Sequence, residues 1–174
     1  MFRDDQLIDQ LAALWNSDCL NPNALPDIAT HLLVLEIDSP ALRELAGLDL
    51  GPLAEFDASD LFKDVLSELG AREQPKVERL QRVSAILAHR CLANVDPERL
   101  TTHRFYRLAV RENYPSEPPE IMLMFYRDDF WDDGIYTLVD QTTAVRSIAS
   151  ELLQRLDLLD WKPDQLMEQG ILVS

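Results

Sequence analysis

The chain has 174 residues, of which 47% are hydrophobic, and it carries 16 basic and 31 acidic side chains for a net charge of −15. This length favours one domain over residues 1–174, with enough apolar material for a core that needs neither disulfides nor a structural metal. A charge of this sign repels bare nucleic acid and anionic membranes, and it attracts basic partners.

The cysteine content and the N-terminal residues favour a cytoplasmic protein. Cys19 lies in a polar turn and Cys91 on an apolar helix stripe, a pattern typical of reduced thiols rather than of a secreted disulfide framework. Charged side chains from Arg3 onward interrupt any signal-peptide pattern, and the longest apolar runs are too short to span a bilayer.

The charge is distributed unevenly along the chain. Residues 1–70 carry three basic against fourteen acidic side chains, and residues 112–174 carry four against thirteen. Residues 71–111 carry nine basic against four acidic side chains. Because folding can place the basic middle against the acidic ends, part of this asymmetry is expected to be neutralised within the chain.

Periodicity and capping residues predict four helices in the first 70 residues. We expect them at residues 3–16, at 26–36, from Pro40 to Gly47, and from an N-cap at Asp57 to a stop at Gly70.

The clearest helical pattern spans residues 75–94, near the middle of the chain. Its apolar stripe consists of Val77, Leu80, Val83, Ser84, Leu87 and Cys91. Arg79 and Arg82 lie on a neighbouring face, so the helix can carry core on one side and a cationic ridge on the other. Asp96 is the expected N-cap of the next helix, at residues 97–112.

Residues 120–140 are ambiguous, because short apolar runs cannot be assigned by periodicity. Ile121 to Tyr126 and Ile135 to Val139 fit two strands of a small hairpin, yet Met122 to Met124 fit a helix equally well. A hairpin or an irregular segment is the favoured interpretation.

Helices are also expected at residues 142–158 and 163–169. The fold class is therefore mainly α, a compact bundle of about six or seven short helices.

No motif for catalysis, a cofactor or a metal is present in the sequence. The histidines, His31, His89 and His103, lie in no HxxxH, HExxH or CxxC arrangement, and no GxSxG, GxGxxG or GxxxxGK pattern occurs. We therefore expect no metal, no cofactor and no catalytic residue, which favours a non-enzymatic protein.

One acidic and aromatic loop, residues 127–134, is the candidate site. Its expected partner-binding residues are Asp128, Asp129, Trp131, Asp132 and Asp133. Trp is a frequent interface anchor, and the carboxylates would engage Lys or Arg of a basic partner. The alternative is a solvated loop whose Phe130 and Trp131 pack back onto the core.

The basic ridges, one at Arg79, Arg82 and Arg90 and one at Arg104, Arg107 and Arg111, suggest a nucleic-acid site. The overall charge opposes that interpretation, and ion pairs with the acidic N-terminal helices of the same chain are the better expectation. A pocket for a small anion is the weaker alternative.

Three function classes remain. The first is an acidic cytoplasmic protein that binds a basic protein partner, by analogy of size and charge, and without any motif, with immunity proteins and other inhibitors of cationic proteins. The second is a self-associating adaptor or regulatory module. The third is an enzyme that uses carboxylates and an arginine pocket, which a polar pocket joining His89, Arg107 and a carboxylate would support.

Overall fold

The computed structural model describes residues 7–48, 54–129, 131, 137–161, 163 and 165–173. Over these ranges the fold is mainly helical, as expected, and no strand is formed apart from a single antiparallel bridge between Leu20 and Leu172. The helices are α1 (Leu7–Asn16), α2 (Leu25–Val34), α3 (Pro40–Ala46), α4 (Ala54–Glu68), α5 (Lys76–Leu92), α6 (Glu98–Arg111), α7 (Glu120–Asp129) and α8 (Leu138–Arg155), with short 3-10 turns η1 (Pro22–Ala24) and η2 (Gln165–Glu168).

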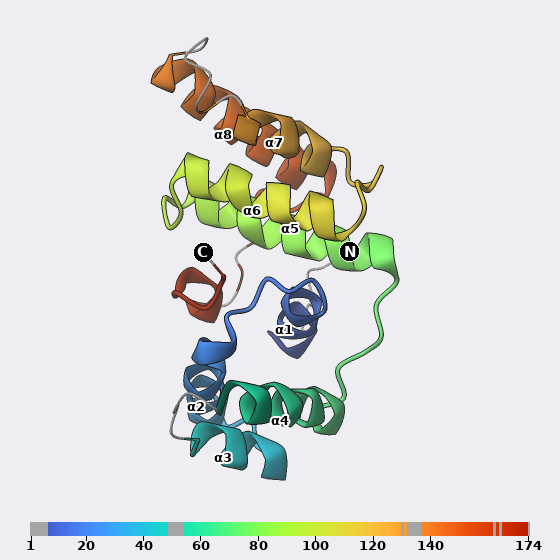
Figure 1. Ribbon diagram of the computed structural model, residues 1–174, viewed down its shortest axis with the longest axis vertical. Coiled ribbons are helices and arrows are strands. Elements are labelled where there is room, and N and C mark those ends of the chain that lie inside the picture. Colours follow the sequence, from blue (N-terminus) through green and yellow to red (C-terminus); the bar gives the residue numbers. More distant parts are fainter. Residues whose placement is uncertain are drawn as a thin grey trace.

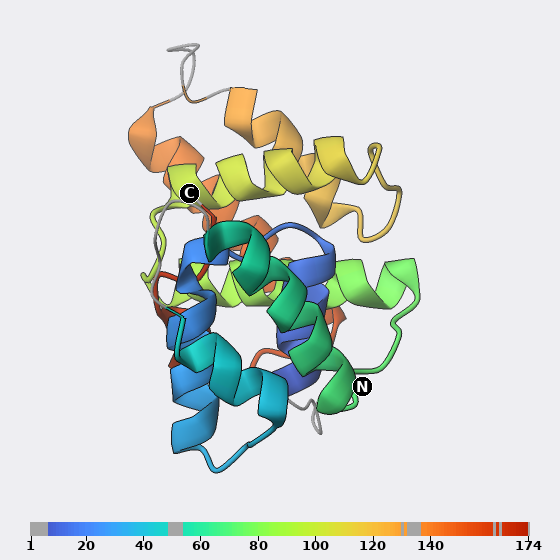
Figure 2. The ribbon, with the colours of Figure 1, turned by 60° about the horizontal axis from the view of Figure 1, so that its bottom comes forward.

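The helices are arranged in layers along the long axis of the molecule (Figure 1). Helices α7 and α8 lie at one end, α5 and α6 cross the middle, and α1 lies on the other side of α5. Helices α2, α3 and α4 form the far end, and Figure 2 shows them grouped together in front of α1 and α5. An edge-to-face contact between Trp15 and Phe62, with ring centroids 5.2 Å apart, joins α1 to α4.

Helix α5 is the central element of the fold, because both its apolar stripe and much of its basic face are buried. Leu80, Val83, Ser84, Leu87 and Cys91 are buried as the pattern predicts, whereas Val77 at the first turn is exposed. Ile86, Ala88, Arg82 and Arg90 are buried as well. A helix that is buried nearly all round lies between packed layers rather than on the surface.

The first basic ridge pairs within the chain, as expected, but its pairing with the N-terminal helices is confirmed in part, through Arg82. Arg79 lies 2.9 Å from Glu112, which follows α6, and Arg82 lies 3.3 Å from Glu78 on its own helix. Arg82 also lies 3.7 Å from Asp9 of α1, so it faces the acidic N-terminal region. Since Arg82 is only 1% exposed, these carboxylates supply the countercharge that its burial requires.

The strand expected at residues 121–126 is wrong, because α7 spans Glu120–Asp129. Its buried apolar residues, Ile121 and Met124, are three positions apart, which fits a helix packed on one face. A two-pronged ion pair from Arg155 of α8 to Glu120, at 2.9 and 2.6 Å, further fixes the first turn. These tertiary contacts select a helix at residues 121–126, where the apolar run by itself is compatible with either a helix or a strand.

Two predicted N-caps are also wrong. Helix α4 begins at Ala54, three residues before Asp57. The N-cap of α6 is Pro97, which makes no side-chain capping bond. Asp96 is buried, and its carboxylate binds arginine side chains instead.

Asp96 is the acceptor for two arginines on different helices. Arg90 of α5 donates two hydrogen bonds to its carboxylate, at 2.6 and 2.9 Å, and Arg104 of α6 donates to the same group. The remaining donors of both arginines bind the C-terminal segment: Arg90 binds the carbonyls of Met167 and Gln169, and Arg104 binds that of Val173. We call Arg90, Asp96 and Arg104 the buried triad.

The triad also sets the protonation behaviour of Asp96. Burial by itself would raise the pKa of its carboxyl, but the hydrogen bonds and charges of Arg90 and Arg104 outweigh burial and hold the pKa below its usual range. A carboxyl whose folded pKa is depressed stabilises the fold above its unfolded pKa, and this contribution is lost as the pH falls through the folded value.

We predict that Asp96→Asn lowers the free energy of unfolding by about 3 kcal/mol at neutral pH, because it leaves two buried guanidinium groups without countercharge. Urea unfolding followed by circular dichroism measures this loss. The difference from the parent should begin to shrink below about pH 4, where Asp96 becomes protonated in the unfolded chain, and should be lost as the pH falls through the lower folded pKa.

The control for this experiment is Asp60→Asn, which removes an exposed partner of Lys63 on α4. It should change stability little, because exposed ion pairs contribute little. Equal effects of the two substitutions would contradict the structural role of the triad.

Candidate functional site

The first three residues of the predicted acidic loop, 127–129, belong instead to the last turn of α7, and this turn is anchored to α6. The Asp128 carboxylate accepts a hydrogen bond from the Thr102 hydroxyl at 3.0 Å, and its other oxygen lies 3.4 Å from Nδ1 of His103. The Trp131 indole N–H donates to the same Thr102 oxygen at 2.8 Å, and the ring packs against the hydrophobic core. Trp131 therefore helps to hold the loop, and its half-buried ring is less available as an interface anchor than the sequence suggests.

Of the remaining residues of the predicted site, the structure describes Asp129. Asp129 is exposed at the end of α7. Asp132 and Asp133, as well as Phe130, lie outside the described residues. A role for these five residues in binding a partner stays a prediction.

A row of aromatic rings runs next to Asp128 across α6 and α7. His103 and Tyr106 are stacked with centroids 6.1 Å apart, and Tyr106 stacks on Phe125 at 5.1 Å with an interplanar angle of 5°. Tyr114 and Tyr126 meet Phe125 edge-to-face at 5.5 and 5.3 Å, and both are more than half exposed. We call these five rings, with Asp128 and Asp129, the aromatic–acidic surface.

Sequence reasoning missed this surface, although a signal was present. His103 and Tyr106 lie three positions apart on the predicted helix at 97–112, so they share a face, and Tyr114 follows two residues after the end of that helix. The other half comes from Phe125 and Tyr126, whose placement requires α7 to be a helix that packs on α6.

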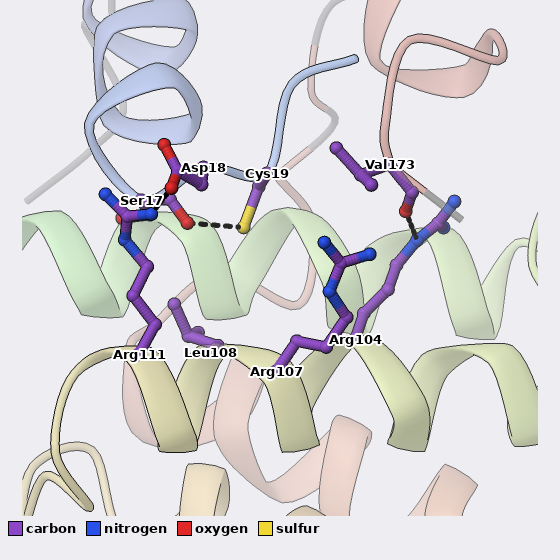
Figure 3. A pocket seen from close by; sticks show the side chains of 8 residues that line it. All are labelled: Ser17, Asp18, Cys19, Arg104, Arg107, Leu108, Arg111 and Val173. Carbon is purple, nitrogen blue, oxygen red and sulfur yellow. Dashed lines mark hydrogen bonds and ion pairs between the residues drawn. The ribbon is translucent and has the colours of Figure 1, made fainter.

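A second candidate is a pocket of about 140 Å³ beside α6. Figure 3 shows three arginine side chains extending from α6 toward the loop that follows α1 and toward the C-terminal segment. The lining residues are Ser17, Asp18, Cys19, Arg104, Arg107, Leu108, Arg111 and Val173. We call this cavity the arginine pocket.

Its floor and its rim differ in exposure. Ser17, Arg104 and Leu108 are buried, whereas Asp18, Arg107 and Arg111 are exposed. Backbone hydrogen bonds hold the walls together: Val173 N–H donates to the Cys19 carbonyl at 3.0 Å, and Asn21 N–H donates to that of Ile171 at 2.7 Å.

The charges in the pocket are unbalanced toward positive. Asp18 forms an ion pair with Arg111 at the rim, and Arg104 binds Asp96 and the Val173 carbonyl behind the floor. Three guanidinium groups therefore line a cavity to which one carboxylate belongs. In the second basic ridge, Arg104 and Arg111 thus form ion pairs within the chain, and all three arginines line the cavity.

Cys19 contributes a neutral group to this wall. Burial raises the pKa of its thiol to about 12, against the opposing charges of Arg104 and Arg107. The thiol donates to the Ser17 carbonyl at 3.3 Å. At neutral pH it adds no negative charge to the pocket.

His89 is not part of this pocket. Its ring meets Trp161 edge-to-face at 6.2 Å, so the combination of His89, Arg107 and a carboxylate that would favour an enzyme is not found in the pocket lining. Within the described ranges no group of three His, Cys, Asp or Glu residues could hold a metal ion. No helix there is both long and apolar enough to cross a membrane.

Comparison with known proteins returned no match to a family model, to a curated protein or to a solved structure.

We predict that Cys19 reacts with iodoacetamide about 1,000-fold more slowly than a free peptide cysteine below pH 9, because a pKa raised from 9.0 to about 12 lowers the thiolate fraction by that factor. Peptide mass mapping after timed alkylation separates Cys19 from the buried Cys91. Alkylation of Cys19 at the rate of a free cysteine would contradict the raised pKa.

Proposed function

We propose that this protein is a binding module that engages a basic segment of a partner protein through its aromatic–acidic surface. The observation that carries the proposal is the continuous row of partly exposed rings that ends at the Asp128 carboxylate. Aromatic faces attract Lys and Arg side chains, and nearby carboxylates pair with the same cations.

The charge of the whole chain supports this choice of partner. A net charge of −15 raises the local concentration of cationic proteins around the molecule and speeds their encounter at low salt. Part of the basic middle is paired within the chain, for example through the triad and through Arg79 and Glu112, and the net charge of −15 is what remains after every cation is counted. An inhibitor that covers a cationic protein is the role that fits these properties best.

The rings give the surface the contact area that charge by itself lacks. Tyr114 and Tyr126 are 54% and 56% exposed, so both can bury further area on binding. Tyrosine combines a large rigid apolar body with a polar tip, and it is enriched among the residues that dominate interface energies. The proposal therefore places the main anchors at Tyr114 and Tyr126, with Trp131 in a supporting role.

We predict that replacing Asp128, Asp129, Asp132 and Asp133 with Asn weakens binding of a fluorescent Lys- and Arg-rich peptide, since charge pairing at the surface is lost. Fluorescence anisotropy at low and moderate salt measures the affinity.

Tyr126→Ala should weaken binding of the same peptide by about ten-fold at both salt concentrations, because the contribution of the ring is largely independent of screening.

A charge-matched control separates a local site from the general field. The variant with Asp27→Asn, Glu36→Gln, Glu44→Gln and Asp64→Asn removes four exposed carboxylates from the α2–α4 end, which lies far from α7 in Figure 1. It has the same net charge as the loop variant and should retain most of the affinity. Equal losses in the two variants, or no loss in either, would overturn the proposed surface.

A further inference from the structure

The arginine pocket is a second site with chemistry opposite to that of the aromatic–acidic surface. It presents cations in a chain whose overall charge is strongly negative, and it lies on a neighbouring face of α6. Arg104, Arg107 and Arg111 follow each other at steps of three and four residues, so they project toward the same side of the helix. Figure 3 shows Arg107 between the other two, with its guanidinium group directed toward Cys19.

We propose that the arginine pocket binds a small oxyanion, the carboxylate or phosphate group of a molecule with at most a few carbon atoms. Guanidinium groups present N–H donors in a planar fork that matches both kinds of anion. The volume of about 140 Å³ limits the ligand to a small molecule, and the apolar wall of Leu108 and Val173 can accommodate a short carbon chain.

The hydroxyl of Ser17 is an independent reason to expect a polar ligand. Ser17 is only 2% exposed, it lines the pocket, and its Oγ has no hydrogen-bond partner among the described residues. A buried polar group without a partner is costly, and ordered water or a ligand normally satisfies it. In this proposal the oxyanion is the acceptor of this hydroxyl.

Asp18 is the carboxylate that an oxyanion would replace at Arg111. Its carboxylate pairs with Arg111 at the rim, where the two side chains are 68% and 40% exposed. An exposed ion pair of this kind contributes little free energy, so an incoming anion can replace Asp18 at modest cost. Asp18 also has a positive φ of 47°, a conformation that Asn adopts as readily as Asp, so an Asn substitution keeps the loop intact.

Arg104 has a different role from the other two arginines. Its donors bind Asp96 and the Val173 carbonyl, so it anchors the floor of the pocket. Arg107 and Arg111 lie at the exposed rim and supply the groups that would contact the ligand. The test therefore changes Arg107 and Asp18 and leaves the triad unaltered.

Isothermal titration calorimetry tests the proposal. The protein is titrated with sodium phosphate and, separately, with sodium propionate, and chloride keeps the ionic strength constant. We expect saturable binding of one equivalent of at least one anion, and the two titrations distinguish a phosphate from a carboxylate ligand. Arg107→Met should weaken this binding by about ten-fold, since it removes a charged donor. Asp18→Asn should strengthen it several-fold, because the competing carboxylate is removed.

The matched control is Arg43→Met, which makes the same change of charge on α3, where Arg43 pairs with Asp38. Its affinity for the anion should equal that of the parent. Circular dichroism spectra and unfolding midpoints of all variants confirm that they are folded. Absence of saturable binding of both anions, or equal affinities of Arg107→Met and Arg43→Met, would overturn the proposal. The variant with Asn at 128, 129, 132 and 133 should bind the anion as the parent does. A failure of the anion-binding proposal therefore does not count against the aromatic–acidic surface, which the peptide-binding experiment tests separately.

Discussion

A buried carboxylate shared by two arginines is the constraint on which the rest of this structure depends. Asp96 joins the end of α5 to the first half of α6, and the same arginines hold the carbonyls of the C-terminal segment. Charges taken out of water are tolerated only when they are paired and fully hydrogen-bonded. The loop between α5 and α6 and the C-terminal segment must therefore both be in place for the triad to be satisfied, and Arg104 and Val173, which line the arginine pocket, belong to this network.

The helical fold could be predicted from sequence because most of its elements are set by local rules. Ser39 caps α3 and Gly47 ends it, as their residue types indicate, and the stripe from Leu80 to Cys91 forms the core face of α5. The predictions failed where a distant partner decides the outcome. Asp96 has the residue type of an N-cap, but its carboxylate instead accepts a hydrogen bond from Arg104. The run at 121–126 becomes a helix because it packs on α6 and because Arg155 pairs with Glu120 at its start.

The candidate sites were predictable to a smaller extent for the same physical reason. The sequence identifies Asp128 and Asp129 as acidic and exposed near aromatics, but the aromatic row requires two helices to be brought together. The arginine pocket needs three separate segments, the loop after α1, α6 and the C-terminal residues. Helical spacing shows that Arg104, Arg107 and Arg111 share a face, and it cannot show that Ser17 and Cys19 lie opposite them.

The bridge between Leu20 and Leu172 has a consequence for how the molecule folds. Helices α2, α3 and α4 follow one another closely and contact one another, so they can form through local encounters, which are fast. The bridge instead joins residues 152 positions apart, and the entropy of closing so long a loop must be overcome before its hydrogen bonds form. The wall of the arginine pocket is thus held by contacts between the two ends of the described chain, and its closure carries a larger entropic cost than the local packing of α2, α3 and α4.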